Sequence, residues 1–358
     1  MRDIRVLVVD DSTVFRKIIR DALSGIPGVD VIGHAENGVL ATKMIQELQP
    51  DLVTLDIEMP EKNGMKVLQE CREKCIRTRA IVVSSLSKSS HQSTMAALGL
   101  GAFDFVLKPS GESIEENATL LRKELEPRIK VLRVACQSNN LAGTDRTKPQ
   151  IVEPKPQPFC GIPEIVVIGT STGGPVALGK LLPMLGELPV PVLIVQHMPA
   201  GFTRTLAEDL NKKCDLEVAE AHGGEQLRPG LCLIAPGGRH MKVVRTGSGV
   251  FTRVTDDPPV LSCRPSVDYM FQSVSEAFGS SILAVILTGM GDDGSRSLNA
   301  MHAQGVNVIA QDEASCTVFG MPRQVIEQGN ADHVLPLDKI ANTVRKIIVP
   351  RGVMACNI

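Results

Sequence analysis

Residues 164–175 read EIVVIGTSTGGP, an apolar run that passes directly into a turn of small residues and glycines. A continuous apolar run is typical of a strand in a parallel sheet that is covered on both faces. The glycines then permit a sharp turn into a helix, so the stretch predicts the strand–turn–helix unit of an α/β fold. Gly169–Gly173 also satisfies G-x-S-x-G, the spacing of a nucleophile elbow with Ser171 at its apex. On these residues alone, a dinucleotide-binding turn or a tight packing turn stays possible.

The rest of the C-terminal half repeats this alternation of apolar strands and helical patterns. One stretch differs, because residues 240–254 (HMKVVRTGSGVFTRV) alternate around Gly247 and Gly249 and predict an inserted β-hairpin. We therefore expect a doubly wound, mostly parallel α/β domain with an inserted β-hairpin. Its other buried-strand candidates are VPVLIVQHM (190–198), SILAVILTGM (281–290) and GVNVIAQ (305–311).

The N-terminal half shows the same alternation of strand and helix patterns, with five candidate strands. Helical spacing separates them, and Ser12 can cap the first helix. This pattern predicts a (βα)5 domain with an open, doubly wound sheet. The candidates are IRVLVVD (4–10), VDVIGHA (29–35), DLVTLDI (51–57), AIVVSSL (80–86) and FDFVLKP (103–109).

The two halves are joined by a stretch of different composition. Regular apolar spacing fades after Arg133, and residues 136–161 are rich in Pro, Gln, Asn and Thr. We assign residues 3–125 to the first domain, 126–160 to a linker and 161–350 to the second domain.

Composition excludes several classes of protein. The net charge of −2 gives no reason to expect binding to nucleic acid, and an aromatic content of 3% argues against base-stacking surfaces. No apolar stretch reaches the length of a membrane span, and the N-terminus carries acids where a leader would be apolar. Nine cysteines without C-x-x-C spacing fit reduced thiols, so we expect a cytoplasmic protein with no membrane insertion.

Polar residues gather at the ends of the N-terminal strands. Asp10 and Asp11 end the first strand, Asp56 ends the third, Ser84 the fourth and Lys108 the fifth. Parallel strands end at one edge of the sheet, so these groups are expected to meet there. Three close carboxylates favour a hard cation such as Mg²⁺, and the lysine can balance a bound anion. The set suits phosphoryl transfer with Asp56 as nucleophile, although a single aspartate there could equally cap a helix.

The C-terminal strand ends offer a second chemistry. Ser171 needs a base, and the next strand ends in His197. A further strand ends in a glycine-rich turn that holds Asp292 and Asp293, so the chain order is Ser, His, Asp. A dinucleotide site would place an acid where Gln196 and His197 stand, which counts against that alternative.

In the N-terminal half, VVDDS, TLDIEMP, VVSS and LKPS resemble the receiver domain of two-component response regulators, over residues 3–125. The resemblance implies that Asp56 accepts phosphate from a histidine kinase and that Asp10, Asp11 and Asp56 bind Mg²⁺. It also implies that Ser84 and Lys108 contact the phosphoryl group, and that a cis bond precedes Pro109.

In the C-terminal half, GTSTGGP, QHMP, IAPGGRHM, RPSVD and LTGMGDDG resemble the catalytic domain of the bacterial chemotaxis protein-glutamate methylesterases, which are also glutaminases. The resemblance implies Ser171 as nucleophile, His197 as general base and Asp293 as the orienting carboxylate. Asp293 is favoured over Asp292 because the family's acid directly precedes a glycine. By the same resemblance, Thr172 supports the imidazole and the Met290 amide belongs to the oxyanion hole.

Together these resemblances imply a phosphorylation-regulated serine hydrolase of chemotaxis. Its substrates would be glutamate γ-methyl esters and glutamines on the cytoplasmic region of chemoreceptors, with a chemotaxis histidine kinase as phosphodonor. Mg²⁺ would serve the receiver, and the esterase site would need no cofactor. The alternatives are a DNA-binding output domain, a nucleotide-binding module, and an esterase with a target outside chemotaxis.

Overall fold

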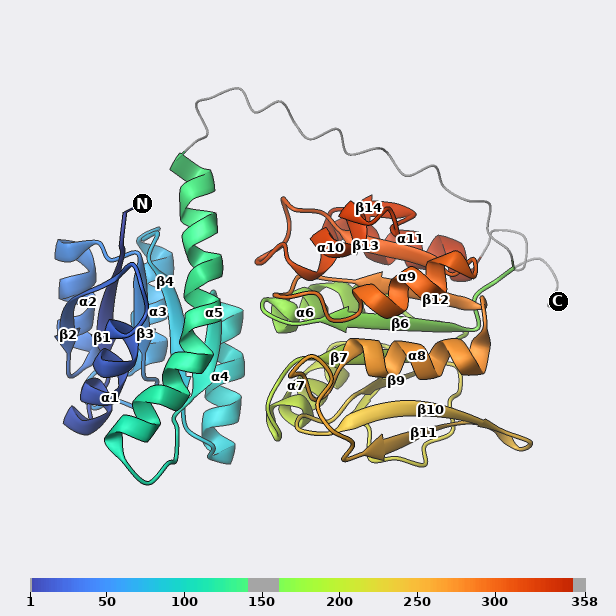
Figure 1. Ribbon diagram of the computed structural model, residues 1–358, viewed down its shortest axis with the longest axis horizontal. Coiled ribbons are helices and arrows are strands. Elements are labelled where there is room, and N and C mark those ends of the chain that lie inside the picture. Colours follow the sequence, from blue (N-terminus) through green and yellow to red (C-terminus); the bar gives the residue numbers. More distant parts are fainter. Residues whose placement is uncertain (1, 141–160, 350–358) are drawn as a thin grey trace. The chain divides into compact units, whose positions relative to one another are not determined.

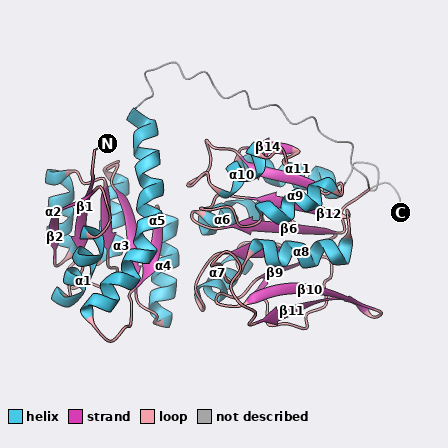
Figure 2. Ribbon diagram, in the orientation of Figure 1, coloured by secondary structure: helices cyan, strands magenta, loops and turns pink. Residues whose placement is uncertain are grey.

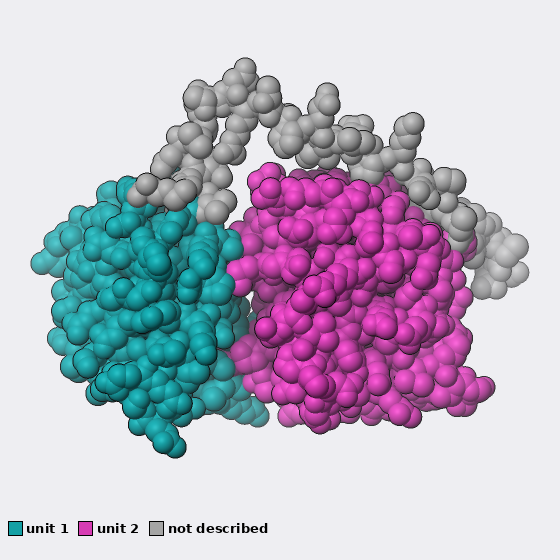
Figure 3. Space-filling view, in the orientation of Figure 1, with its two compact units in different colours: residues 1–149 teal, residues 150–358 magenta. Residues whose placement is uncertain are grey.

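The apolar strands of the two halves form two separate sheets, each in a unit of its own. The computed structural model describes residues 2–140 and 161–349. The chain divides into a first unit, residues 1–149, and a second unit, residues 150–358 (Figure 3). Part of the predicted linker lies outside the described residues, so the boundaries at 125, 160 and 350 stay predictions.

The first unit contains a five-stranded parallel sheet of order β2-β1-β3-β4-β5. This confirms the predicted (βα)5 arrangement (Figure 1). The strands β1, β3, β4 and β5 are almost wholly buried, because helices cover both faces, whereas the edge strand β2 is partly exposed along most of its length. Their bounds are β1 Ile4–Val9, β2 Val29–Ala35, β3 Leu52–Leu55, β4 Arg79–Ser84 and β5 Asp104–Leu107.

Five helices connect and follow these strands. One of them, α1, packs against α5, whereas α2, α3 and α4 pack in succession (Figure 2). Ser12 caps α1 as predicted, since its hydroxyl accepts a hydrogen bond of 3.4 Å from the amide of Phe15. The bounds are α1 Thr13–Ser24, α2 Gly38–Leu48, α3 Gly64–Glu73, α4 Lys88–Leu100 and α5 Ile114–Asn140.

The last helix of the first unit runs well beyond the predicted end of that domain. Residues 126–140 were expected to be linker, but they continue α5, and Ile129 and Leu132 are buried. The apolar spacing of the sequence does continue to Arg133, past the predicted boundary at 125, and only the polar residues after Arg133 gave no helical signal.

The second unit contains a seven-stranded sheet of order β14-β13-β12-β6-β7-β9-β8. All its strand pairs are parallel, as the sequence predicted for most of them. Since β6 comes first in the chain, later strands add on both of its sides. The order reverses beside β6, and ligands of such sheets bind at this kind of switch point. The bounds are β6 Ile165–Thr170, β7 Val192–Gln196, β8 Glu217–Glu220, β9 Leu231–Ile234, β12 Ile282–Ile286, β13 Asn307–Gln311 and β14 His333–Leu335.

Helices flank this sheet, and a hairpin stands apart from it. The predicted hairpin forms as β10 (His240–Thr246) and β11 (Gly249–Thr255), which pair antiparallel and pack against α8 (Figure 1). Helix α6 packs against α7 and α11, while α9 packs against α8 and α10. The bounds are α6 Gly174–Leu185, α7 Phe202–Asn211, α8 Val267–Phe278, α9 Ser295–Ala303, α10 Met321–Glu327 and α11 Leu337–Ile348.

Two further expectations concern the backbone and the membrane. The bond before Pro109 is trans, so the expected cis bond there is wrong; the structure has a cis bond at Arg264–Pro265 instead. Within residues 2–140 and 161–349, no helix combines the length and the apolar character that crossing a membrane requires.

We predict that Gly237→Ala destabilises the second unit and that Gly179→Ala does not. A Cβ on Gly237 would lie 2.3 Å from the carbonyl oxygen of Pro199, a backbone atom that cannot move aside alone. Such overpacking costs about 1–3 kcal/mol of unfolding free energy. A Cβ on Gly179, inside α6, meets no atom within 4 Å, so alanine there should add about 0.5–1 kcal/mol.

Urea unfolding measures both changes. The chain has one tyrosine, Tyr269 in α8, so tyrosine fluorescence reports the second unit. Equal midpoints for the two variants would contradict the packing described at Gly237.

Candidate active site

The pairing of β6 with β7 brings the predicted serine and histidine together. Thr170 is the register partner of Gln196, so the next residues, Ser171 and His197, follow neighbouring strand ends side by side. The amide of His197 donates a 3.1 Å hydrogen bond to the carbonyl of Thr170. The Gln196 side chain donates one of 2.9 Å to the carbonyl of Ser171. These bonds fix the two segments to one another.

The serine lies on a tight turn between β6 and α6. Its amide donates to the carbonyl of Thr288 at 3.1 Å, and its own carbonyl accepts from the amide of Gly174 at 2.8 Å. Gly173 has a φ of 81°, a left-handed conformation that favours glycine. A Cβ there would also lie 2.5 Å from the side chain of Thr317. The last glycine of the G-x-S-x-G motif is thus required by the backbone of the turn.

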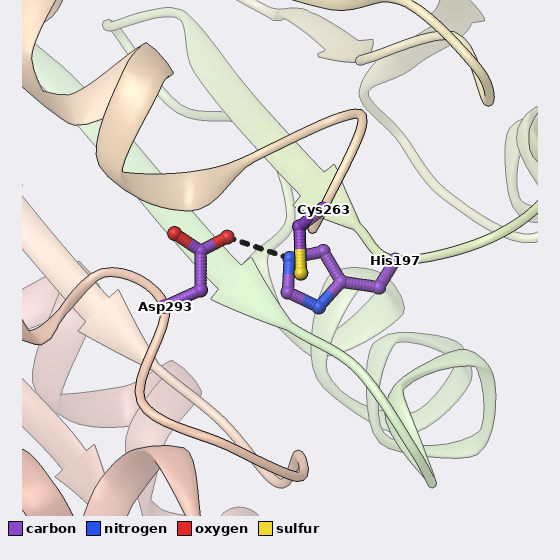
Figure 4. Close-up of side chains that lie close together, drawn as sticks. All are labelled: His197, Cys263 and Asp293. Carbon is purple, nitrogen blue, oxygen red and sulfur yellow. Dashed lines mark hydrogen bonds and ion pairs between the residues drawn. The ribbon is translucent and has the colours of Figure 1, made fainter. Parts of the chain in front are cut away.

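The histidine meets one of the two candidate carboxylates. His197 Nε2 lies 2.8 Å from Oδ2 of Asp293 (Figure 4). Asp293 is buried with 3% of its surface exposed, whereas Asp292 is exposed. The structure therefore pairs Asp293 with the imidazole, although its role in a reaction stays a prediction.

The carboxylate of Asp293 is held by the beginning of α8. It accepts hydrogen bonds from the hydroxyl of Ser266 at 2.8 Å and from the amides of Val267 at 2.7 Å and Asp268 at 3.0 Å. Burial alone would raise the pKa of Asp293, but the hydrogen bond and charge of His197 and the two amides lower it. Asp293 is therefore a carboxylate that the helix N-terminus stabilises.

The environment of His197 has two consequences for its chemistry. Burial by itself would lower its pKa, but hydrogen bonds with Asp293 and Cys263 outweigh burial and raise the pKa above its ordinary value. Because Nε2 faces Asp293, Nδ1 is the ring nitrogen left to exchange a proton with another group. A base at this position would thus act through Nδ1.

The two predicted supporting residues both lie close to the serine turn. Thr172 is buried, and its carbonyl accepts a 3.0 Å hydrogen bond from the hydroxyl of Thr288. Met290 directly follows Gly289, where a Cβ would lie only 2.9 Å from the Cβ of Ser171. This proximity is compatible with an oxyanion contact at the Met290 amide, and both roles stay predictions.

Three residues of the site were not predicted from the sequence. Ser266 binds Asp293 and also caps α8, Thr288 bonds to the serine turn through its side chain and carbonyl, and Cys263 lies beside His197 (Figure 4). Ser266 could have been found, because the serine of RPSVD precedes an apolar helical pattern as an N-cap does. The sequence offered no comparable signal for Cys263 or Thr288.

The first unit brings its predicted acidic residues together as well. Carboxylate oxygens of Asp10, Asp11 and Asp56 lie within 4.8 Å of one another. Lys108 Nζ lies 2.8 Å from Oδ2 of Asp10 and 2.7 Å from Oδ2 of Asp56. Asp10 and Asp56 are buried while Asp11 is exposed, so the cluster has an open side. An oxygen-only ligand set that needs positive charge fits a hard divalent cation such as Mg²⁺.

The pKa of Asp56, the candidate phosphoacceptor, is shifted by its surroundings. Burial raises the pKa of Asp56, with a further contribution from the charge of Asp10, and Lys108 opposes the shift by its hydrogen bond and charge. Ser84 is buried at the end of β4, where its hydroxyl accepts a 2.7 Å hydrogen bond from Thr94. The predicted roles of Ser84 and Lys108 toward a phosphoryl group stay predictions.

Comparison with known proteins finds the same two parts. The family model of the response regulator receiver domain matches residues 6–118, and that of the CheB methylesterase matches residues 166–344. A protein-glutamate methylesterase/protein-glutamine glutaminase from Desulfotalea psychrophila is 45% identical over 96% of this chain and 98% of its own. A protein of the same name from Halalkalibacterium halodurans is 42% identical over 95% of this chain and 97% of its own. The crystal structure of the Thermotoga maritima CheB methylesterase catalytic domain matches 51% of this chain and 97% of its own, with 43% identity and a TM-score of 0.50.

We predict that Lys108→Gln raises the pKa of Asp56 further. The substitution removes the hydrogen bond and the charge that lower this pKa, and it leaves burial and Asp10 in place. A carboxyl NMR titration without divalent cations measures the change. The control is Lys17→Gln, at an exposed lysine that pairs with Asp21 on α1. An Asp56 pKa that stays unchanged or falls in Lys108→Gln would contradict the description of this cluster.

Proposed function

The chain belongs to the family of receiver-linked protein-glutamate methylesterase/protein-glutamine glutaminases, and we propose that Ser171, His197 and Asp293 are its catalytic groups. It is a phosphorylation-regulated enzyme of chemotactic adaptation. The observation that carries the residue assignment is the 2.8 Å contact between His197 Nε2 and a buried carboxylate, next to the strand end that presents the serine. The substrate is a glutamate γ-methyl ester or a glutamine of a chemoreceptor.

The first half of the reaction transfers the glutamyl group to the serine. His197 Nδ1 takes the proton of Ser171 Oγ while that oxygen attacks the γ-carbonyl carbon. The imidazolium then gives its proton to the leaving methoxide oxygen, and methanol departs. A glutamine substrate loses ammonia in the same way. In the second half a water molecule, deprotonated by the same imidazole, hydrolyses the glutamyl ester and restores the serine.

Asp293 supports both proton transfers without taking a proton itself. Its carboxylate holds the Nε2 proton, so the neutral imidazole presents an unprotonated Nδ1. The same contact stabilises the imidazolium that forms during attack. Since it also raises the pKa of His197, the rate should increase with pH as the imidazole loses its extra proton.

The developing oxyanion needs donors that are already in place. We assign this role to the Met290 amide, because Gly289 packs directly against the side chain of Ser171. Amides at the beginning of α6 add the positive end of a helix dipole near the same point. Thr172 is assigned to the support of the imidazole.

The receiver controls this site through Asp56. We propose that a chemotaxis histidine kinase supplies the phosphoryl group in the cytoplasm, where chemoreceptors expose their glutamates. Asp10, Asp11 and Asp56 would hold Mg²⁺, which supplies positive charge for phosphoryl transfer. Lys108 would then contact the phosphoryl oxygens from its position between Asp10 and Asp56, and Ser84 would turn toward them.

We predict that Ser171→Ala abolishes hydrolysis. Loss of the nucleophile should lower methanol release from methylated receptor membranes by on the order of 10⁴-fold or more. Ser248→Ala, in the exposed turn of the hairpin, is the matched control and should keep the wild-type rate. Hydrolysis that persists in a folded Ser171→Ala protein would refute the assignment.

We also predict that a small-molecule phosphodonor with Mg²⁺ raises the esterase rate through Asp56. Coupling between sites in one protein typically amounts to about 5–150-fold. Asp56→Asn should lose this response, whereas Asp21→Asn, at a partly exposed carboxylate of α1 that pairs with Lys17, should retain it. If the phosphodonor raised the rate equally in wild type and Asp56→Asn, the regulation would not act through Asp56.

A further inference from the structure

A cysteine completes a group of three metal-ligating side chains at the catalytic histidine. A nitrogen of His197, the sulfur of Cys263 and an oxygen of Asp293 lie within 4.8 Å of one another. In Figure 4 the sulfur lies against the imidazole ring, and the carboxylate approaches the same ring from the side. The mechanism proposed above uses the histidine and the aspartate but gives the thiol no part.

The backbone that presents Cys263 has an unusual conformation. Val260 and Cys263 exchange two backbone hydrogen bonds, of 3.1 and 2.8 Å, and enclose a two-residue turn. Leu261 and Ser262 in that turn have φ values of 49° and 64°, although neither is glycine. Left-handed non-glycine residues of this kind persist where the surrounding structure holds them, and they cluster at functional sites. The turn fixes the thiol at the histidine while its own two side chains are exposed.

The ligand types point to a particular class of cation. Imidazole nitrogen, thiolate sulfur and carboxylate oxygen are the donors that bind Zn²⁺. Many zinc centres in enzymes have three protein ligands and leave the fourth coordination position open. The acidic cluster of the first unit offers only oxygens, so it favours Mg²⁺ and is a poor competitor for a borderline-soft metal.

The carboxylate is already oriented for such a role. Ser266, Val267 and Asp268 hold Asp293 independently of His197, and second-shell contacts of this kind position metal ligands. The ligand atoms would have to separate slightly. Bonds of about 2.0–2.2 Å in a tetrahedral site place nitrogen and oxygen roughly 3.3 Å apart, compared with the present 2.8 Å. The imidazole nitrogen and the carboxylate oxygen would therefore move apart by about 0.5 Å when the metal binds.

We propose that His197, Cys263 and Asp293 form an inhibitory Zn²⁺ site, an inference that rests on the proposed catalytic role of His197. The metal binds the thiolate and the thiol proton leaves to solvent. It also takes the place of the proton on Nε2, so the neutral imidazole carries its single proton on Nδ1. That nitrogen can then no longer accept the proton of Ser171, and hydrolysis stops until the metal is removed.

The test compares metal responses of full-length variants in saturating Mg²⁺. Zn²⁺ should inhibit methanol release by the wild type, and a zinc-selective chelator should restore it. With each variant normalised to its own metal-free rate, Cys263→Ser should require at least about tenfold more Zn²⁺ for the same inhibition. Cys214→Ser changes a half-buried cysteine of the same unit and should respond as the wild type does.

Cobalt provides a readout that does not depend on activity. Co²⁺ added to the wild type should produce a thiolate-to-metal absorption band, which Ser171→Ala should retain and Cys263→Ser should lose. Zn²⁺ inhibition and a cobalt band that are both unchanged in Cys263→Ser would overturn the zinc site. Hydrolysis that survives in Ser171→Ala, while the cobalt band still depends on Cys263, would instead overturn the proposed catalytic function and leave the metal site standing.

Discussion

The contact between Asp293 and His197 is the interaction on which the rest of the esterase unit depends. A buried carboxylate is unfavourable unless donors surround it, and here the beginning of α8 and the imidazole supply them. This one group therefore ties the end of β12 to the end of β7 and to the cap of α8. This contact also fixes the imidazole with Nε2 at the carboxylate, so Nδ1 is the nitrogen that the proposed mechanism assigns to the serine.

The topology of the sheet makes this contact possible. Strands add on both sides of β6, so the ends of β7 and β12 lie on opposite sides of the serine turn. Three segments far apart in the sequence thus reach one point without any loop having to cross the sheet. The first unit uses the same principle on a smaller sheet, where the ends of β1, β3 and β5 bring Asp10, Asp56 and Lys108 into contact. The two sheets thus carry different side chains at their strand ends, an acidic cluster with a lysine in the first unit and the proposed catalytic groups in the second.

Much of this arrangement was predictable, and the exceptions have physical reasons. Long apolar runs such as those of β6 and β12 are recognisable in the sequence, and the four-residue strands β3 and β5 lie within the longer predicted stretches 51–57 and 103–109. The strands β8, β9 and β14, of three or four residues, were not predicted. The positions of Ser171 and His197 at predicted strand ends indicated them as candidates. The spacing of the residues did not distinguish Asp292 from Asp293. Only the fold shows that one is buried against α8 while the other faces solvent. Cys263 was missed because a backbone turn, which no residue pattern announces, sets it at the histidine.

A comparison of Asp293→Asn with Asp292→Asn tests the central claim most directly. The steady-state rate of methanol release from methylated receptors should fall by on the order of 10⁴-fold in Asp293→Asn, because an amide cannot hold the required imidazole tautomer. Asp292→Asn should stay close to the wild type, since its side chain is exposed. A loss confined to Asp292→Asn, or equal small losses in both, would contradict the account.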